Sequence, residues 1–194
     1  MHVLAIEYPA YGLYKMCSPD ENQIKEDAEI VYKYLTKHIG IRHQDIILFG
    51  RSMGSGPATH LASLYPAHSL LLMSPYTSIK DVARTLLGRL SFLLTPLVYE
   101  RFRNIDTIKR AQCPVFLLHG IQDTLIPPSH AQDLYNSCPT FCKLQLAPYM
   151  DHNEFDFLAD LINPFKEFIG KVEEQRGREN LGKGFSKTLR TETV

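Results

Sequence analysis

DIILFGRSMGSGPATHLAS, residues 45–63, joins a short apolar run to a glycine-rich turn and a stretch with helical spacing. The apolar run predicts a buried strand, and the residues after Gly54 predict a helix. Gly50, Ser52 and Gly54 form a G-x-S-x-G pattern, which is typical of a strained turn that lifts a serine hydroxyl clear of a sheet. At the two flanking positions, larger side chains would collide with the neighbouring strand and helix. The segment predicts either a catalytic serine or a tight turn with a purely structural role.

Similar apolar runs recur along the chain, and helical patterns separate them. Five runs predict strands: residues 2–8, 45–50, 69–74, 113–120 and 143–148. Strands that alternate with helices are typical of an α/β fold, with a mostly parallel sheet and helices on both faces. We therefore expect a sheet of about five strands.

Two segments depart from this alternation. Residues 75–112 contain helical patterns but no strand pattern, which predicts a small helical cap inserted into the domain. Residues 175–194 are polar and have no apolar period, which predicts a disordered tail. The domain itself is expected to span residues 1–174.

The composition narrows the class of protein. The 194 residues include 21 basic and 21 acidic residues, and this balance argues against a nucleic-acid-binding protein. No apolar run is long enough to span a membrane, and no leader of the targeting type begins the chain. The cysteines form no C-x-x-C motif, so they are expected to be thiols in a reducing, cytoplasmic compartment: Cys17, Cys113, Cys138 and Cys142. No metal-ligand motif is present, and neither a metal nor another cofactor is expected.

Ser52 needs a base to become nucleophilic, and the base needs an acid to orient it. Asp123 follows the strand at 113–120, and His152 follows the strand at 143–148. All three residues therefore fall at the carboxyl edge of the predicted sheet, where sites form in α/β proteins. The alternatives are that Asp123 begins a turn, that His152 is a surface residue, or that Asp151 is the acid.

The motifs around these residues resemble the α/β-hydrolase superfamily. Three of them carry the resemblance: GRSMG around Ser52, HGIQDTLIP around Asp123 and DHNEF around His152. More narrowly, EYPAYGLY and SPYTSIKDVA resemble the membrane-associated protein-depalmitoylase subgroup of α/β-hydrolase domain-containing proteins. The similarity extends over about residues 3–169.

The resemblance implies a serine hydrolase with a Ser52–His152–Asp123 triad that cleaves an ester or thioester. The backbone N–H of Met53, at the start of the helix after Ser52, would stabilise the oxyanion. The implied substrate is an acylated protein or a small ester, and a full-length form would lie at membranes. A serine peptidase of the same superfamily and a catalytically silent binding module are the alternative functions.

Three further features modify this expectation. Asp151 stands where relatives have glycine, which could alter the loop that carries His152. The family has three strands before the one expected at residues 2–8, so the chain resembles an N-terminally truncated form without the second oxyanion donor. Loss of one such donor lowers rates by about 100- to 1,000-fold, so weak or no turnover is expected of this chain. The apolar cap residues would either line an acyl site or pack the cap onto the domain: Leu86, Leu87, Leu90, Phe92, Leu93 and Leu94.

Overall fold

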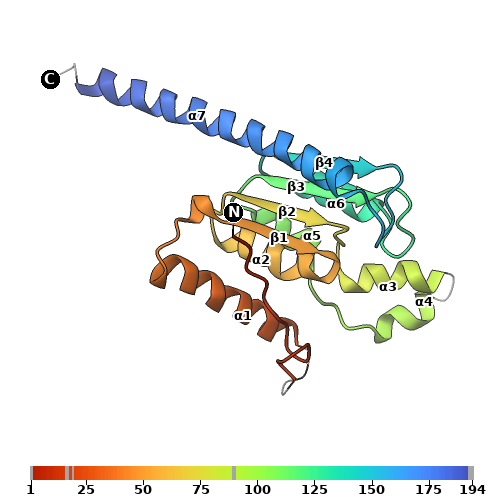
Figure 1. The fold of residues 1–194 in the computed structure, drawn as a ribbon. Coiled ribbons are helices and arrows are strands. Elements are labelled where there is room, and N and C mark those ends of the chain that lie inside the picture. The colour runs from red at the N-terminus through yellow and green to blue at the C-terminus, as the bar shows by residue number, and fades with distance from the viewer. Residues whose placement is uncertain (1, 16–17, 19, 89–90, 192–194) are drawn as a thin grey trace. The chain divides into compact units, whose positions relative to one another are not determined.

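The computed structural model describes residues 2–15, 18, 20–88 and 91–191 (Figure 1). Its internal contacts divide the chain into two units, Met1–Phe155 and Asp156–Val194. This division falls before the C-terminal helices. The domain expected at residues 1–174 stays a prediction. Among the described residues, no helix combines the length and apolar character that a membrane span requires.

The first unit is built on a four-stranded parallel sheet with the order β1-β2-β3-β4. Its strands are β1 (Ile47–Arg51), β2 (Ser69–Met73), β3 (Val115–Gly120) and β4 (Cys142–Ala147). Every residue of β2 and β3 is buried, which explains why these strands appear in the sequence as continuous apolar runs. The predicted parallel sheet is confirmed.

The strand predicted at residues 2–8 is wrong. This segment forms no strand, and Val3 and Leu4 are 84% and 61% exposed. Ile6 does pack against the hydrophobic core, so the apolar run has a partial structural role. β1 is an edge strand, because only β2 pairs with it among the described residues. Residues 2–8 do not add a strand at this edge, so their N–H and C=O groups form no ladder with the sheet. Over the residues that the structure describes, the sheet therefore has four strands.

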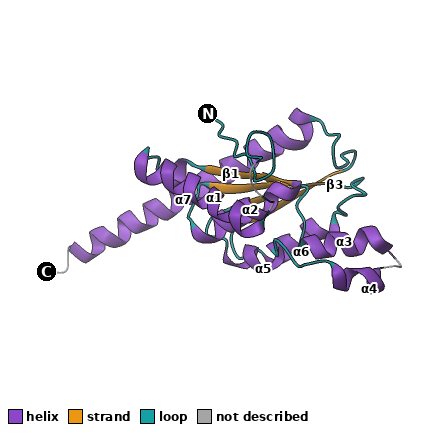
Figure 2. Ribbon diagram, turned by 90° about the horizontal axis from the view of Figure 1, so that it is seen from below, coloured by secondary structure: helices purple, strands orange, loops and turns teal. Residues whose placement is uncertain are grey.

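The main core lies between one face of the sheet and helices of the first unit (Figure 2). These helices are α1 (Glu21–Lys33), α2 (Ser55–Leu64) and α6 (Ser129–Ser137). Alternate strand residues such as Leu48, Leu70 and Leu117 point into this core, because side chains alternate across a strand. Helix α1 begins at an Asp20 cap, whose side chain accepts hydrogen bonds from the N–H groups of Asn22 and Gln23.

Residues 75–112 form helical pieces with no strand among those described, as expected for the cap. They comprise α3 (Ile79–Leu87), α4 (Ser91–Leu94) and α5 (Asn104–Thr107), with single turns η5 (Thr95–Leu97) and η6 (Ile108–Arg110).

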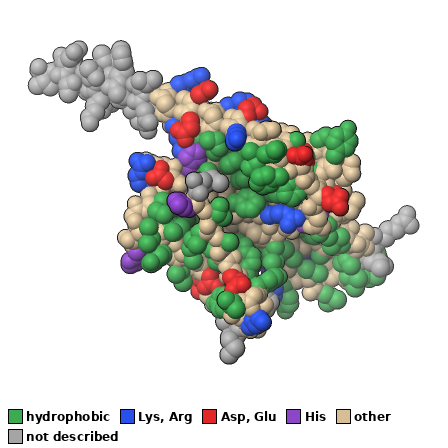
Figure 3. All heavy atoms as spheres, in the orientation of Figure 1, with side chains coloured by type: hydrophobic (Ala, Val, Ile, Leu, Met, Phe, Trp, Pro, Cys, Tyr) green, Lys and Arg blue, Asp and Glu red, His purple; other side chains and the backbone are tan. Residues whose placement is uncertain are grey.

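The apolar side chains of α3 and α4 are exposed. Leu86 is 56% exposed, Phe92 is 73% exposed and Leu93 is 59% exposed. Hydrophobic side chains gather accordingly at the lower right of Figure 3, around these helices. The expectation that these residues pack the cap onto the domain is therefore wrong for the exposed ones. Leu90 lies outside the described residues.

The second unit contains η7 (Phe157–Ile162), a π-helical segment capped by Asp156, followed by α7 (Asn163–Thr191). Helix α7 includes most of the segment that was expected to be disordered. In the first half of this helix, Lys171 pairs with Glu167 at 2.7 Å, an i,i+4 spacing that supports a helix.

Candidate active site

Ser52 lies on a strained turn between β1 and α2. Its φ angle is +50°, in the left-handed region that residues other than glycine rarely adopt. Residues Ser52–Gly54 form a single 3₁₀ turn. A Cβ atom at Gly50 would lie 2.4 Å from the carbonyl oxygen of Gly54 and 2.8 Å from the Cβ of Ala58. A Cβ at Gly54 would meet only the Tyr8 hydroxyl, at 3.3 Å. The turn thus requires glycine at the first flanking position more strictly than at the second.

The structure brings the three predicted side chains together at the carboxyl edge of the sheet. Nε2 of His152 lies 3.1 Å from Oγ of Ser52, and Nδ1 of His152 lies 2.8 Å from Oδ2 of Asp123. Both distances are those of hydrogen bonds. The imidazole therefore bridges a hydroxyl and a carboxylate, which is the arrangement that proton transfer from the serine requires.

Asp123 is a buried carboxylate, only 3% exposed. Its Oδ1 accepts hydrogen bonds from the N–H groups of Leu125 (3.0 Å) and Ile126 (2.8 Å). Burial raises the pKa of Asp123, but hydrogen bonds from His119, the Ile126 N–H and His152 outweigh burial and lower the pKa to about 2. Asp123 is therefore ionised at neutral pH and can stabilise a positively charged imidazole.

Asp151, the alternative acid, binds the backbone of its own loop. Its Oδ1 accepts the N–H groups of Asn153 and Glu154, both at 2.6 Å. These backbone bonds lower the pKa of Asp151 and hold the loop that carries His152. The carboxylate that the structure brings to the His152 ring is that of Asp123.

His119 is a second imidazole beside Asp123 that sequence reasoning missed. It is fully buried, and its Nε2 donates to the carbonyl of Ile126 at 2.7 Å while lying 3.5 Å from Oδ2 of Asp123. His119 therefore supports the loop that carries Asp123. Its position four residues before Asp123 in the HGIQD segment is the only signal in the sequence.

Arg51 also escaped sequence reasoning, because the position before the serine carries no pattern of its own. Its Nη2 donates to the carbonyl of His152 at 2.6 Å and to Oδ1 of Asn153 at 3.0 Å. The Nε atom of Arg51 is buried without a hydrogen-bond partner among the described atoms. The guanidinium thus ties the end of β1 to the loop that carries His152, and we infer that Arg51 is a positioning residue.

Replacement of Arg51 by methionine should slow covalent labelling of the serine by about 100-fold, because a displacement of the loop by about 1 Å has an effect of that size. The measurement is the rate of reaction with a fluorophosphonate probe across a pH series. Arg42→Met is the matched control, because Arg42 forms an exposed ion pair with Asp45. Equal labelling rates for both variants would contradict the positioning role.

The oxyanion site remains a prediction. Met53 follows Ser52 in the turn, and its carbonyl accepts the Tyr76 hydroxyl at 3.3 Å. Burial raises the pKa of Tyr76 above its ordinary range, which keeps this hydroxyl a donor. Within the described part of the chain, no group of three or more His, Cys, Asp or Glu side chains is arranged to hold a metal ion.

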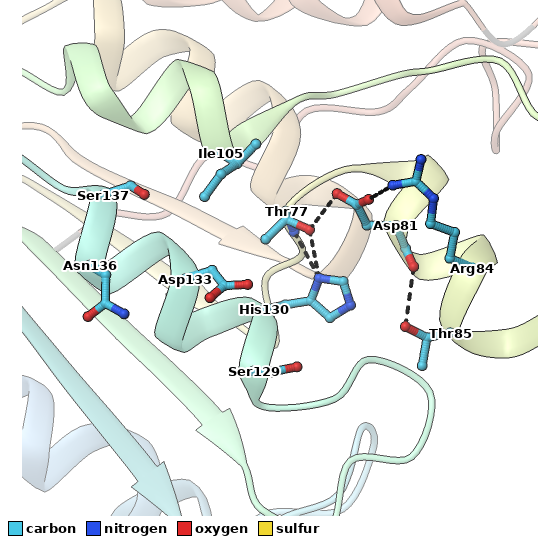
Figure 4. Close-up of a pocket in the computed structure, with 10 residues that line it drawn as sticks. All are labelled: Thr77, Asp81, Arg84, Thr85, Ile105, Ser129, His130, Asp133, Asn136 and Ser137. Atoms are coloured by element: carbon cyan, nitrogen blue, oxygen red, sulfur yellow. Dashed lines mark hydrogen bonds and ion pairs between the residues drawn. The ribbon is translucent and has the colours of Figure 1, made fainter. Parts of the chain in front are cut away.

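A polar pocket of about 530 Å³ lies elsewhere in the first unit, between α3 and α6 (Figure 4). On its wall, Nδ1 of His130 faces the Thr77 hydroxyl at 2.8 Å, and that hydroxyl donates to Asp81 at 2.9 Å. Burial lowers the pKa of His130, which favours the neutral form of its imidazole. The residues that line this pocket do not include Ser52, Asp123 or His152.

The chain is similar in sequence to curated alpha/beta hydrolase domain-containing proteins. It is 29% identical over 170 residues to protein 17C of Xenopus tropicalis, covering 87% of this chain and 52% of that protein. Identity to aho-3 of Caenorhabditis elegans is 29%, covering 87% of this chain and 48% of aho-3. Identity to human protein 17B is 28%, covering 88% and 57%. The chain thus spans about half the length of the curated relatives it matches.

No protein-family model matches the chain. Among solved structures, the acetyl xylan esterase from Paenibacillus sp. R4 superposes with a TM-score of 0.62 at 16% identity, covering 85% of this chain and 60% of the esterase. A monoacylglycerol lipase from Paleococcus ferrophilus gives a TM-score of 0.55 at 18% identity, covering 76% of each chain. The resemblance in the motifs is confirmed: the chain has the α/β-hydrolase fold and is similar in sequence to alpha/beta hydrolase domain-containing proteins.

Proposed function

We propose that this chain provides the catalytic site of a serine hydrolase that cleaves an ester or thioester through an acyl-enzyme. The observation that carries the proposal is the hydrogen-bonded series from Ser52 through His152 to the buried Asp123. The similarity to alpha/beta hydrolase domain-containing proteins and the fold shared with an esterase and a lipase support it.

In the proposed reaction, Nε2 of His152 takes the Ser52 proton while Oγ attacks the carbonyl carbon of the substrate. The oxyanion of the tetrahedral intermediate would be stabilised by the N–H of Met53 and by the positive end of α2. The imidazolium, held by Asp123, then gives its proton to the departing alcohol or thiol. Water, deprotonated by His152, attacks the acyl-enzyme and returns Ser52 to its free form.

The proposed substrate class is a fatty-acyl ester or thioester, including acylated cysteine on proteins. The exposed apolar residues of α3 and α4, such as Leu86 and Phe92, support this class because transfer of an acyl chain from water to an apolar surface lowers the free energy. The motif resemblance to protein depalmitoylases points to the same chemistry. Such a substrate would place a full-length form in the cytoplasm at a membrane surface.

Two other functions are compatible with part of the observations. A serine peptidase uses the same three residue types, because acyl transfer from an amide proceeds through the same intermediates. A silent binding module would keep the fold and bind an acyl group without turnover. The substrate panel below separates the three functions.

The test measures hydrolysis of matched acyl esters, acyl thioesters and an acyl amide, each with short and long acyl chains. We expect turnover of esters and thioesters, faster for long chains, and none of the amide. Amide cleavage at a similar rate would favour the peptidase. A folded chain that binds the long-chain substrate without cleaving any of the panel would favour the binding module.

A further inference from the structure

The polar pocket between α3 and α6 contains none of the residues that the proposed hydrolase uses. Its volume of about 530 Å³ is within the range of small-molecule sites in proteins. Ile105 is the one apolar side chain among the described residues that line it, and the others are polar or charged. An apolar ligand such as an acyl chain would leave these polar groups without hydrogen bonds. The pocket therefore suits a ligand that forms hydrogen bonds.

His130 has one ring nitrogen left for such a ligand. Its side chain is nearly buried, because the residue is only 6% exposed. Nδ1 of His130 lies 2.8 Å from Oγ1 and 3.3 Å from the backbone nitrogen of Thr77. No hydrogen bond joins Nε2 of His130 to any residue that the structure describes. Figure 4 shows this second nitrogen on the side of the ring away from Thr77, toward Thr85.

A series of hydrogen bonds on the wall of the pocket fixes the His130 ring. The Thr77 hydroxyl, which contacts Nδ1, donates to Oδ2 of Asp81 at 2.9 Å. The Ser78 hydroxyl donates to the same carboxylate oxygen at 2.8 Å, and Nη1 of Arg84 donates to Oδ1 of Asp81 at 2.6 Å. The ring is therefore oriented before a ligand arrives, which reduces the entropy that binding would cost.

The charges of the pocket exclude an anionic ligand. Asp81 and Arg84 form an ion pair with each other, so Asp133 supplies the remaining charge, which is negative. Burial lowers the pKa of His130, so the ring supplies no balancing positive charge in its favoured neutral form. A phosphate or carboxylate would therefore meet net repulsion.

The remaining groups of the pocket include both donors and acceptors. His130, Asp133 and Asn136 lie at intervals of three residues and so share one face of α6. The Asp133 carboxylate accepts hydrogen bonds, whereas Asn136 has N–H groups to donate because its Oδ1 already accepts from Gln132. An ammonium group only donates and would leave these N–H groups unmatched. A hydroxyl both donates and accepts, so it can bond to Nε2 of His130 in either tautomer.

We propose that the pocket between α3 and α6 binds a small polyhydroxylated molecule, a monosaccharide or a cyclic polyol. One hydroxyl of the ligand bonds to Nε2 of His130, and further hydroxyls bond to the carboxylate of Asp133 and the amide of Asn136. This site is separate from the proposed hydrolase and does not depend on it.

The test titrates the ¹⁵N-labelled chain with glucose and with myo-inositol and follows the imidazole nitrogens by NMR. We expect the Nε2 signal of His130 to shift and to saturate. The signals of His43 and His60 should stay unchanged, because their rings are bonded to Tyr32 and Glu29. Cyclohexanol, cyclohexylammonium and inorganic phosphate are the matched probes for a single hydroxyl, a cation and an anion. None of the three should shift His130.

A variant then locates the contacts. Asp133→Ala removes an exposed carboxylate and should weaken polyol binding by about tenfold, the size expected for a hydrogen bond to a charged group. Asp45→Ala is the matched control, because Asp45 is another exposed carboxylate and lies outside the pocket. Its affinity for the polyol should equal that of the wild type.

The signal of His130 reports binding and needs no turnover, so a failure of the hydrolase proposal would leave this test intact. The binding proposal is overturned if neither polyol shifts His130. It is also overturned if any of the three matched probes shifts His130 as strongly as the polyols do, or if Asp133→Ala binds them as tightly as the wild type.

Discussion

Replacement of Ser52 by alanine is expected to abolish covalent labelling by a fluorophosphonate probe and to lower ester turnover by about a million-fold. That size is typical for loss of the nucleophile from a serine hydrolase site. The physical reason is that the alanine methyl group can neither attack a carbonyl nor donate a proton to Nε2 of His152, 3.1 Å from the serine oxygen. Probe labelling is measured by intact mass, and turnover with the best substrate of the panel.

The control for this prediction is Ser129→Ala, which removes a hydroxyl from the pocket of Figure 4 and leaves the three candidate residues untouched. Its labelling and turnover should equal those of the wild type. Ser52→Ala should also unfold at about the same temperature as the wild type, because alanine must adopt the same strained φ angle of +50°. Probe attached to a folded Ser52→Ala chain would rule out Ser52 as the nucleophile.

Replacement of Asp123 by asparagine is expected to lower turnover by about 10⁴-fold while Ser52 and His152 remain in place. Asparagine has the shape of aspartate but no charge, so it neither stabilises the imidazolium nor holds the tautomer that accepts the serine proton. Steady-state turnover and the rate of probe labelling both measure this loss.

Asp151→Asn is the matched control, because asparagine Oδ1 can still accept the two backbone N–H groups that Asp151 binds. We expect its turnover to stay within a few-fold of the wild type. A large loss in Asp151→Asn together with normal turnover in Asp123→Asn would reverse the assignment of the acid.

Acid stability gives a readout for Asp123 that does not depend on turnover. The pKa of Asp123 is lowered to about 2 in the folded chain, against about 3.9 in an unfolded chain. The folded state therefore gains stability from the ionised carboxylate above pH 4, and this gain of about 2–3 kcal/mol is lost as pH falls towards 2. Urea unfolding should show a weaker pH dependence for Asp123→Asn than for the wild type in this window. Equal slopes would contradict the hydrogen bonds described for Asp123.

The strands show most clearly which features follow from local sequence. Strands β2 and β3 were predicted correctly because strands buried on both sides of a parallel sheet are almost wholly apolar. The same rule failed at residues 2–8, since an apolar run indicates burial but says nothing about a neighbouring strand.

By itself, the sequence determined the parallel α/β sheet, the strained turn at Ser52 and the placement of Asp123 and His152 just beyond strand ends. These features depend on residues a few positions apart, whose spacing sets strand, turn and helix. Only the tertiary structure decided that Asp123 and not Asp151 meets the imidazole, and that Arg51 holds its loop. Those contacts join residues 29 and 101 positions apart, so they depend on how the sheet stacks its strand ends, which no local pattern encodes.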